Sequence, residues 1–375
     1  MASLEPVQSK GVSRISRLVT RQRLIVAACL IVLAAIVLLS LHYLRPGPSA
    51  DAQLQAIDAA HALPDEQNAG KDYTLLVLNG AGAFLDPQLL VQNFQALAQP
   101  WRSADLPEAA KWIEERRAII DALLQGGRKP KCWFPLSESD GQSEKRLQVA
   151  WNGTLLLLQA ANNDFAEGRA EAGMEKLLCV FQMAEHFRSQ MNLSDHQIGL
   201  SIASEGLKYL NRLLVTQDCP QEWLAKFEAA LPPSRDITEK ERDQLHEIQR
   251  LILRKSLPFH ERILSTFAVS MSFRQMKQTY SAYLSEARAA RILLALRRHK
   301  DQTGAWPATL VEIQGQIPPE ALIDPLTRKP FVYSATGDSL VLYNVGPNGI
   351  DEGGLLGDDY HFWPPGERWA GSVKY

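Results

Sequence analysis

The chain has 375 residues, of which 46% are hydrophobic and 22% are charged, and its formal net charge is −2. This composition is typical of a folded chain with one large domain or two smaller ones. The near-balance of charge gives no reason to expect a nucleic-acid partner, because nucleic-acid binding usually needs a clustered basic surface.

The first predicted element is a long apolar run near the N-terminus. It is unbroken from residue 24 to residue 39 and continues less purely to Leu44. About twenty apolar residues can cross a hydrocarbon core of roughly 30 Å as a helix. A signal peptide would have a shorter apolar core and a small-residue cleavage site, so we expect an uncleaved transmembrane anchor at residues 24–44, with a cleaved signal as the alternative. Five basic residues precede the run: Lys10, Arg14, Arg17, Arg21 and Arg23.

This basic flank predicts the topology of the chain. Positive residues are retained on the cytoplasmic side of a membrane. We therefore expect residues 1–23 to form a cytoplasmic tail and residues 45–375 to lie across the membrane. Residues 45–70 are rich in Pro, Ala, Asp and Gln and are interpreted as a linker, in which a short helix over Ala50–His61 is the one element expected.

A helical hydrophobic period continues through residues 71–284 and predicts an α-helical ectodomain. Within it, residues 147–161 and 170–190 are expected to form a helical hairpin around a turn at 162–168. The hairpin resembles a tetratricopeptide unit. A solenoid needs about three such repeats to bury its core, so we expect an irregular helical bundle with one tetratricopeptide-like hairpin.

Four cysteines occur, one of them, Cys29, in the apolar run. The other three are Cys132, Cys179 and Cys219, and no pair has the Cys-x-x-Cys spacing of a zinc or redox site. At most one intramolecular disulfide could form among these three, and the sequence does not select a pair. Buried free thiols are the alternative.

The hydrophobic period changes after Gly304. A short helix is expected to begin at Pro307, and two alternating runs, 331–333 and 340–343, are joined by a turn-rich segment that predicts a β-hairpin. Residues 360–363 are a candidate third strand. We assign residues 285–375 to a small C-terminal α+β module with a β-hairpin or a three-stranded sheet.

This module resembles the C-terminal globular part of the major pseudopilin of type II secretion. The resemblance covers roughly residues 285–363 and follows the order and spacing of these residues: Trp306-Pro307, Asp324-Pro325, Pro330-Phe331, Tyr333, Leu342-Tyr343, Gly346, Gly349, Gly353-Gly354 and Asp358-Asp359. It implies a bacterial envelope protein related to secretion. Pilin-like signals carry an acidic residue in the apolar helix, and residues 24–44 contain none, so assembly into a fibre is not expected.

The layout of anchor, helical ectodomain and C-terminal module is also similar to that of uncharacterised membrane-anchored bacterial proteins. It implies a single-pass protein of the bacterial inner membrane with a periplasmic ectodomain. The partners that we expect are the membrane, through residues 24–44, and other envelope or secretion proteins.

In the pseudopilins the last loop binds calcium, and the resemblance implies a calcium site in this chain. Calcium takes roughly six to eight oxygen ligands, from carboxylates and backbone carbonyls in a flexible loop. The last loop supplies such oxygens, and its glycines let the backbone turn around an ion. The alternative is a solvated acidic turn whose Gly and Asp residues serve only backbone geometry. The candidate ligands are Asp351, Glu352, Asp358 and Asp359, with Asn348 nearby.

The sequence contains no His-Glu-x-x-His, Gly-x-Ser-x-Gly, P-loop or dinucleotide-binding motif. Glu185-His186 and Asp195-His196 could form an acid–base pair across a helix turn, but a surface or core role is the preferred interpretation of these histidines. We therefore assign no catalytic or cofactor-binding residue and expect a non-catalytic structural or interaction protein. The alternative is a periplasmic hydrolase or ligand-binding protein with its site in the helical domain. A deep, charge-lined pocket between helices would favour the alternative, and a filled apolar core the first hypothesis.

Overall fold

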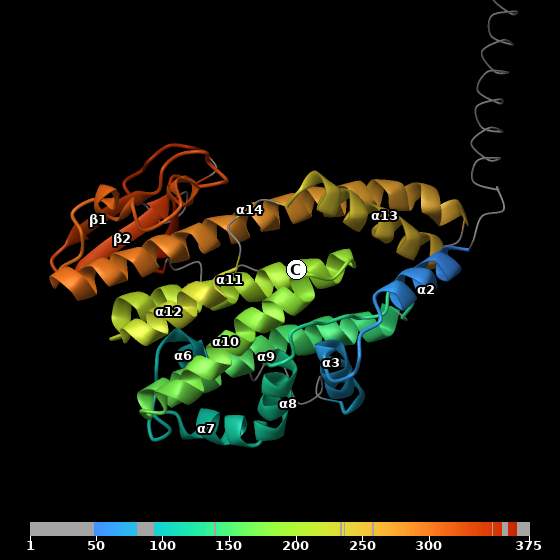
Figure 1. Ribbon diagram of the computed structural model, residues 1–375, viewed down its shortest axis with the longest axis horizontal. Helices are drawn as coiled ribbons and strands as arrows, with labels where there is room; N and C mark the ends of the chain where they lie inside the picture. The colour runs from blue at the N-terminus through green and yellow to red at the C-terminus, as the bar shows by residue number, and fades with distance from the viewer. Residues whose placement is uncertain are drawn as a thin grey trace, which may run out of the picture. The chain divides into compact units, whose positions relative to one another are not determined.

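The computed structural model describes residues 49–80, 94–138, 140–232, 235, 237–256, 259–346, 348–354 and 359–365. The elements described below belong to one compact unit that begins at Ala50 (Figure 1). The predicted cytoplasmic tail and anchor, residues 1–44, lie outside the described residues. Within the described ranges, no helix combines the length and the apolar character needed to span a membrane.

The described residues are mostly helical, as predicted, and contain eleven α-helices. In chain order they are α2 (Ala50–Ala60), α3 (Ala69–Leu78), α6 (Phe94–Ala98), α7 (Pro107–Glu114), α8 (Arg117–Gly127), α9 (Asp140–Ala166), α10 (Ala170–Arg188), α11 (Leu193–Thr216), α12 (Gln221–Ala230), α13 (Glu239–Ser256) and α14 (Phe259–Thr303).

Four of these helices form the centre of the unit, because α9 packs on α10, α10 on α11, and α11 on α14. The apolar stripe expected on α10 is buried in this bundle, with Met174, Leu177 and Phe187 each at most 1% exposed. The helices approach closely at Gly199 of α11, where an added Cβ would lie 2.3 Å from the backbone nitrogen of Arg188. Glycine is therefore required at this crossing.

The turn of the α9–α10 hairpin is shorter than the sequence predicted. Helix α9 continues through residues 162–164 to Ala166, and the chain reverses at Gly168, whose φ is +76°. Asn162, a residue typical of turns, is fully buried in the helix: its amide donates to the carbonyl of Ala96 (2.7 Å) and its side-chain oxygen accepts from the Tyr209 hydroxyl (2.7 Å). Partners distant in sequence satisfy this side chain, so it does not need a turn.

The remaining helices cover the bundle: α3 contacts α8 and α9, α13 contacts α2 and α14, and α12 contacts α14. The chain between α8 and α9 crosses the interior, with Phe134 only 2% exposed. Asn68 holds this crossing, because its side-chain oxygen accepts from the backbone N–H of both Gly70 and Trp133 at 2.9 Å. Cys132, Cys179 and Cys219 are buried free thiols, which agrees with the second of the two expectations for these residues.

The C-terminal sheet has three antiparallel strands in the order β1 (Val332–Thr336), β2 (Ser339–Asn344) and β3 (Tyr360–Trp363), which confirms the hairpin and the third strand. Gly337, at φ +59°, makes the tight turn between β1 and β2. Two 3₁₀ helices, η1 (Leu310–Ile313) and η2 (Pro319–Leu322), precede the sheet and pack on α14. A capping box between Thr309 and Glu312 starts η1.

Helix α14 joins the C-terminal module to the bundle. It runs across residue 284, where the helical ectodomain was expected to end, and both sides share one hydrophobic core. The fully buried Asp324 accepts a hydrogen bond of 2.5 Å from Ser285 on α14, and Arg288 of α14 donates to the carbonyl of Ile323 at 2.7 Å. These contacts fix the start of the sheet region to the helix, so the module is not an independently tethered domain.

Candidate functional sites

The last loop holds the predicted metal ligands, and the structure shows how three of them are used. Asp351 accepts from the Tyr343 hydroxyl and from the backbone N–H of Gly353, both at 2.9 Å. The Asn348 amide donates to Glu352 at 2.7 Å, and its oxygen accepts from the backbone N–H of Ile350. These contacts are those of an acidic turn that stabilises its own backbone. Another predicted carboxylate, Asp358, lies outside the described residues.

Asp359 closes the loop from its other side. It is 5% exposed, and one of its carboxylate oxygens accepts from the backbone N–H of Gly354 at 2.8 Å. The second oxygen, Oδ1, is buried and has no hydrogen-bond partner among the described residues, and the same is true of Oε2 of Glu352. Buried carboxylate oxygens without a partner are chemically suited to a cation. No group of three or more His, Cys, Asp or Glu side chains in the described ranges is arranged to hold a metal ion.

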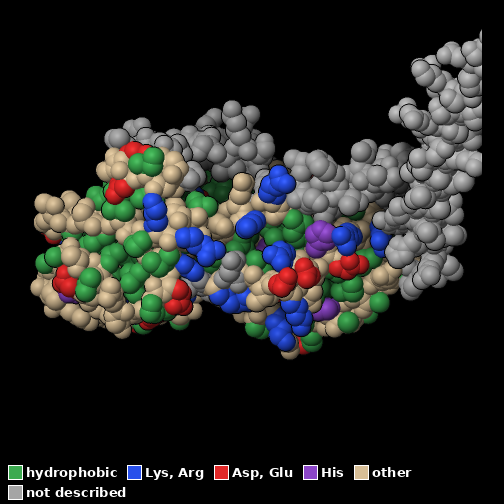
Figure 2. Space-filling model, turned by 90° about the horizontal axis from the view of Figure 1, so that it is seen from above, with side chains coloured by type: hydrophobic (Ala, Val, Ile, Leu, Met, Phe, Trp, Pro, Cys, Tyr) green, Lys and Arg blue, Asp and Glu red, His purple; other side chains and the backbone are tan. Residues whose placement is uncertain are grey.

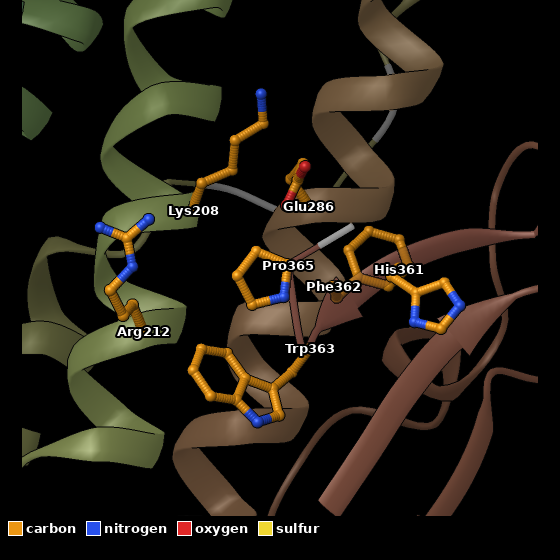
Figure 3. A pocket seen from close by; sticks show the side chains of 7 residues that line it. All are labelled: Lys208, Arg212, Glu286, His361, Phe362, Trp363 and Pro365. Carbon is orange, nitrogen blue, oxygen red and sulfur yellow. The ribbon is translucent and has the colours of Figure 1, made fainter. Parts of the chain in front are cut away.

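A second site lies where β3 meets the bundle. Figure 3 shows Glu286 of α14 between the strand and helix α11, which carries Lys208 and Arg212. Glu286 is 2% exposed, and its Oε1 accepts a 2.6 Å hydrogen bond from the Tyr360 hydroxyl. Its Oε2 has no partner within the described part of the chain. The adjoining cavity, of about 10 Å³, has room for about one water molecule.

Burial dominates the electrostatics of this carboxyl. Removal from water raises the pKa of Glu286 to about 7, while the positive charge of Lys208 and the hydrogen bond from Tyr360 act in the opposite direction. Glu205 adds a small repulsion that raises the pKa further. The site therefore holds a proton that a solvent-exposed glutamate would have released below pH 5.

A larger cavity, of about 290 Å³, opens between α10, α11, α13 and α14. Two ion pairs line it: Glu185 with Arg188 on α10, and Arg235 with Glu241 at the start of α13. The second pair is bidentate, with N–O distances of 3.0 and 2.7 Å. The apolar part of the lining is Met191, Ile237, Leu245 and the ring of Tyr280.

His196 also lines this cavity and is 6% exposed. Its Nδ1 lies 2.6 Å from the carbonyl oxygen of Arg188, so this nitrogen carries the proton and donates it. Its Nε2 is buried and has no partner among the described residues. Burial lowers the pKa of His196 to about 4, so the ring is neutral above pH 5 and Nε2 keeps its lone pair.

The two acidic–histidine pairs considered as acid–base candidates are used separately. Nε2 of His186 donates to the carbonyl of Lys129 (2.9 Å), and its Nδ1 accepts from the Tyr73 hydroxyl (3.0 Å). Asp195 is committed to Arg146, at 3.0 Å. Burial lowers the pKa of His186 to about 4. These contacts are structural, and they give neither histidine an acidic partner within its pair.

The sequence did not reveal the burial of Glu286, the contact of Asp324 with α14 or the lining of the larger cavity. One local signal could have indicated the buried carboxyl: Glu286 is an acidic residue next to the small apolar residues Ala287 and Ala289 of a helical segment. The cavity combines residues from 185 to 280, and no local pattern brings them together.

No protein-family model, curated protein or solved structure was found to match the chain.

Proposed function

We propose that the chain is a non-catalytic, single-pass protein of the bacterial inner membrane whose ectodomain docks other envelope or secretion proteins. In this proposal residues 24–44 are the anchor, residues 1–23 lie in the cytoplasm, and the ectodomain lies in the periplasm. The observation that carries the docking role is the shared core of the helical bundle and the sheet region, which presents the pseudopilin-like module in one fixed orientation. A pre-organised surface loses little freedom on binding and suits an interaction role.

Exposed apolar side chains indicate which surface would dock. Figure 2 shows one face of the molecule, and hydrophobic side chains gather on the left half of that face, the half that holds the C-terminal module. Val311 and Ile350 of the module are 65% and 62% exposed. Single exposed apolar residues are common, so these two positions are probes of the surface and not evidence of a partner by themselves.

Site-specific photocrosslinking tests the docking role. A photoreactive amino acid at Val311 or Ile350 of the full chain in intact cells is expected to give discrete adducts with envelope or secretion proteins, identified by mass spectrometry. Leu75 on α3, which is 55% exposed, is the matched control because it is an apolar surface position outside the module. The same adducts from all three positions, or adducts only with the chain itself, would contradict the proposal.

We also propose that the last loop binds calcium. Asp359 and Glu352 each contribute a buried oxygen without a partner in the described residues, and the remaining ligands would come from Asp351, Asn348 and Asp358. In the absence of the ion these oxygens are desolvated and unsatisfied, which is unfavourable. Calcium would supply the missing positive charge and would fasten the loop to β3.

A thermal-unfolding titration tests the calcium site. Calcium at about 100 times its dissociation constant would add about 2.7 kcal/mol to the free energy of unfolding, which corresponds to a rise of a few degrees in the thermal midpoint. Asp359→Asn is expected to remove this rise, whereas Asp121→Asn, an exposed aspartate on α8, leaves it intact. Magnesium serves as the second control because it prefers a smaller octahedral site. Equal midpoints in calcium and in chelator would exclude the site.

A further inference from the structure

The cavity between α10, α11, α13 and α14 has the features of a small-molecule site. Its volume of about 290 Å³ lies at the lower end of the range of roughly 300–1,000 Å³ that is usual for such sites. Four helices and the segment before α13 contribute to its walls, and polar groups on one side face apolar side chains on the other. It is a charge-lined pocket between helices, the feature that favours the ligand-binding alternative of the sequence analysis. None of its lining residues belongs to the C-terminal module, so a ligand here and the docking proposed above do not exclude each other.

The charges of the cavity balance one another. Glu185 and Arg188 form one ion pair, Arg235 and Glu241 form the other, and His196 is neutral. A ligand with a net charge would therefore find no uncompensated partner. It would have to lose its own hydration and compete with existing pairs, and both effects oppose binding.

Hydrogen-bonding capacity nevertheless remains on these groups. Arg188 uses Nε and Nη2 on a single oxygen of Glu185, at 3.1 and 2.5 Å. Within the described part of the chain, this leaves Nη1 of Arg188 as a donor and Oε1 of Glu185 as an acceptor. The exposed amide of Gln244 offers both a further donor and a further acceptor.

A hydroxyl group suits such a lining because it donates and accepts at the same time. Several hydroxyls on one ring could donate to Glu185 and Gln244 and accept from Arg188 without separating the ion pair. The C–H face of the same ring would contact Met191 and Tyr280 on the apolar wall. A zwitterion would have to replace the contacts within the ion pairs. We propose that this cavity binds a neutral, polyhydroxylated small molecule of one or two sugar rings.

Ligand-observed NMR on the full chain tests this site. The protein is purified in lauryldimethylamine oxide, because a detergent with a sugar headgroup would itself compete. Saturation-transfer signals are measured for glucose, N-acetylglucosamine and cellobiose, with glycylglycine as a zwitterion and succinate as an anion. At least one saccharide is expected to bind, and the zwitterion and the anion are expected to give no signal.

Variants then locate the binding. Arg188→Gln is expected to weaken saccharide affinity by about tenfold or more, because a hydrogen bond from a charged group is lost. Arg117→Gln is the matched control: Arg117 forms the same type of pair with Glu114 three residues earlier, through Nε and Nη2 to one oxygen, on an exposed surface. Gln244→Trp, at an exposed position, is expected to fill the cavity and abolish binding without altering the fold.

Circular dichroism shows whether each variant is folded. If Arg188→Gln does not fold, Gln244→Trp alone still tests whether the cavity binds the saccharide. Three results would overturn the proposal. They are the absence of signal for all three saccharides, saccharide binding that persists unchanged in folded Gln244→Trp, and binding of glycylglycine or succinate, sensitive to Gln244→Trp, without binding of a saccharide.

Discussion

Replacement of Asp195 by Ala is expected to lower the free energy of unfolding by about 2–3 kcal/mol, because the buried guanidinium of Arg146 loses two charged hydrogen bonds and keeps only Glu138 as an acidic partner. Arg146 of α9 and Asp195 of α11 are 3% and 2% exposed at the side chain, and their closest N–O distance is 3.0 Å. Arg146 also lies over the ring of Phe134, at 4.1 Å from its centroid. If the guanidinium turned to solvent, it would lose this cation–π contact. The pair therefore ties two central helices together inside the core.

Urea denaturation of the full chain, followed by tryptophan fluorescence, measures this loss. Arg117→Ala is the control, since it breaks a pair whose side chains are 70% and 65% exposed, and exposed pairs contribute little. The double variant Arg146→Met with Asp195→Leu is expected to recover part of the loss, because it removes both buried charges and fills their space. A loss no larger for Asp195→Ala than for Arg117→Ala would show that the buried pair is not structural.

Replacement of Glu286 by Gln is expected to stabilise the protein at pH 8 by about 3 kcal/mol. The pKa of Glu286 rises from an ordinary value of 4.5 to about 7 because the carboxyl is buried, and each unit of pKa difference corresponds to about 1.4 kcal/mol. A neutral amide has nearly the same shape and can still accept the Tyr360 hydrogen bond. It avoids the cost of a buried carboxylate, so the variant should be the more stable protein in alkaline solution.

The sign of the pH dependence follows from the raised pKa. Below pH 4.5 the carboxyl is protonated in both the folded and the unfolded chain, and the substitution has little effect. Between about pH 4.5 and pH 7 the unfolded chain has released the proton while the folded chain keeps it, so the stability of the natural protein falls as pH rises. Above pH 7 the difference between the two proteins stays constant.

Denaturation of both proteins from pH 4 to pH 8 measures this difference. Subtraction of the two profiles removes the titration of other groups, including His186 and His196, whose lowered pKa values reduce stability as pH falls below 6.5. Glu144→Gln, at an exposed position of α9, is the control and should show a flat difference. A flat difference for Glu286→Gln as well would mean that the carboxyl is hydrated or paired in solution.

A change of charge at Glu286 would act on the attachment of the C-terminal module. The hydrogen bond from Tyr360 joins β3 to α14, and the neighbouring cavity lies between β3 and α11, beside Lys208 and Arg212. Ionisation adds a negative charge at this buried junction, and the positive charge of Lys208, which lowers the pKa of Glu286, would partly compensate it. The contact between strand β3 and helix α14 is therefore expected to depend on pH.

Local patterns in the sequence determined the helical class, the α9–α10 hairpin and the three strands, because periodicity and turn residues act over a few neighbouring positions. They failed where a distant partner replaces a local one. Asn162 is typical of turns but lies inside α9, since the carbonyl of Ala96 and the hydroxyl of Tyr209 satisfy its side chain. The hydrogen bond between Asp324 and Ser285, which fastens the module to α14, joins residues 39 positions apart, and no local pattern predicted it.

The sequence by itself determined the mostly helical class, the α9–α10 hairpin and the C-terminal strands, and it predicted the acidic last loop as a cation site. Only the tertiary structure decided that the C-terminal module shares its core with the bundle, that Glu286 is buried with one oxygen unpaired, and that residues between 185 and 280 line one cavity. The physical reason is that burial and charge pairing depend on segments far apart in the chain, which a local pattern cannot bring together.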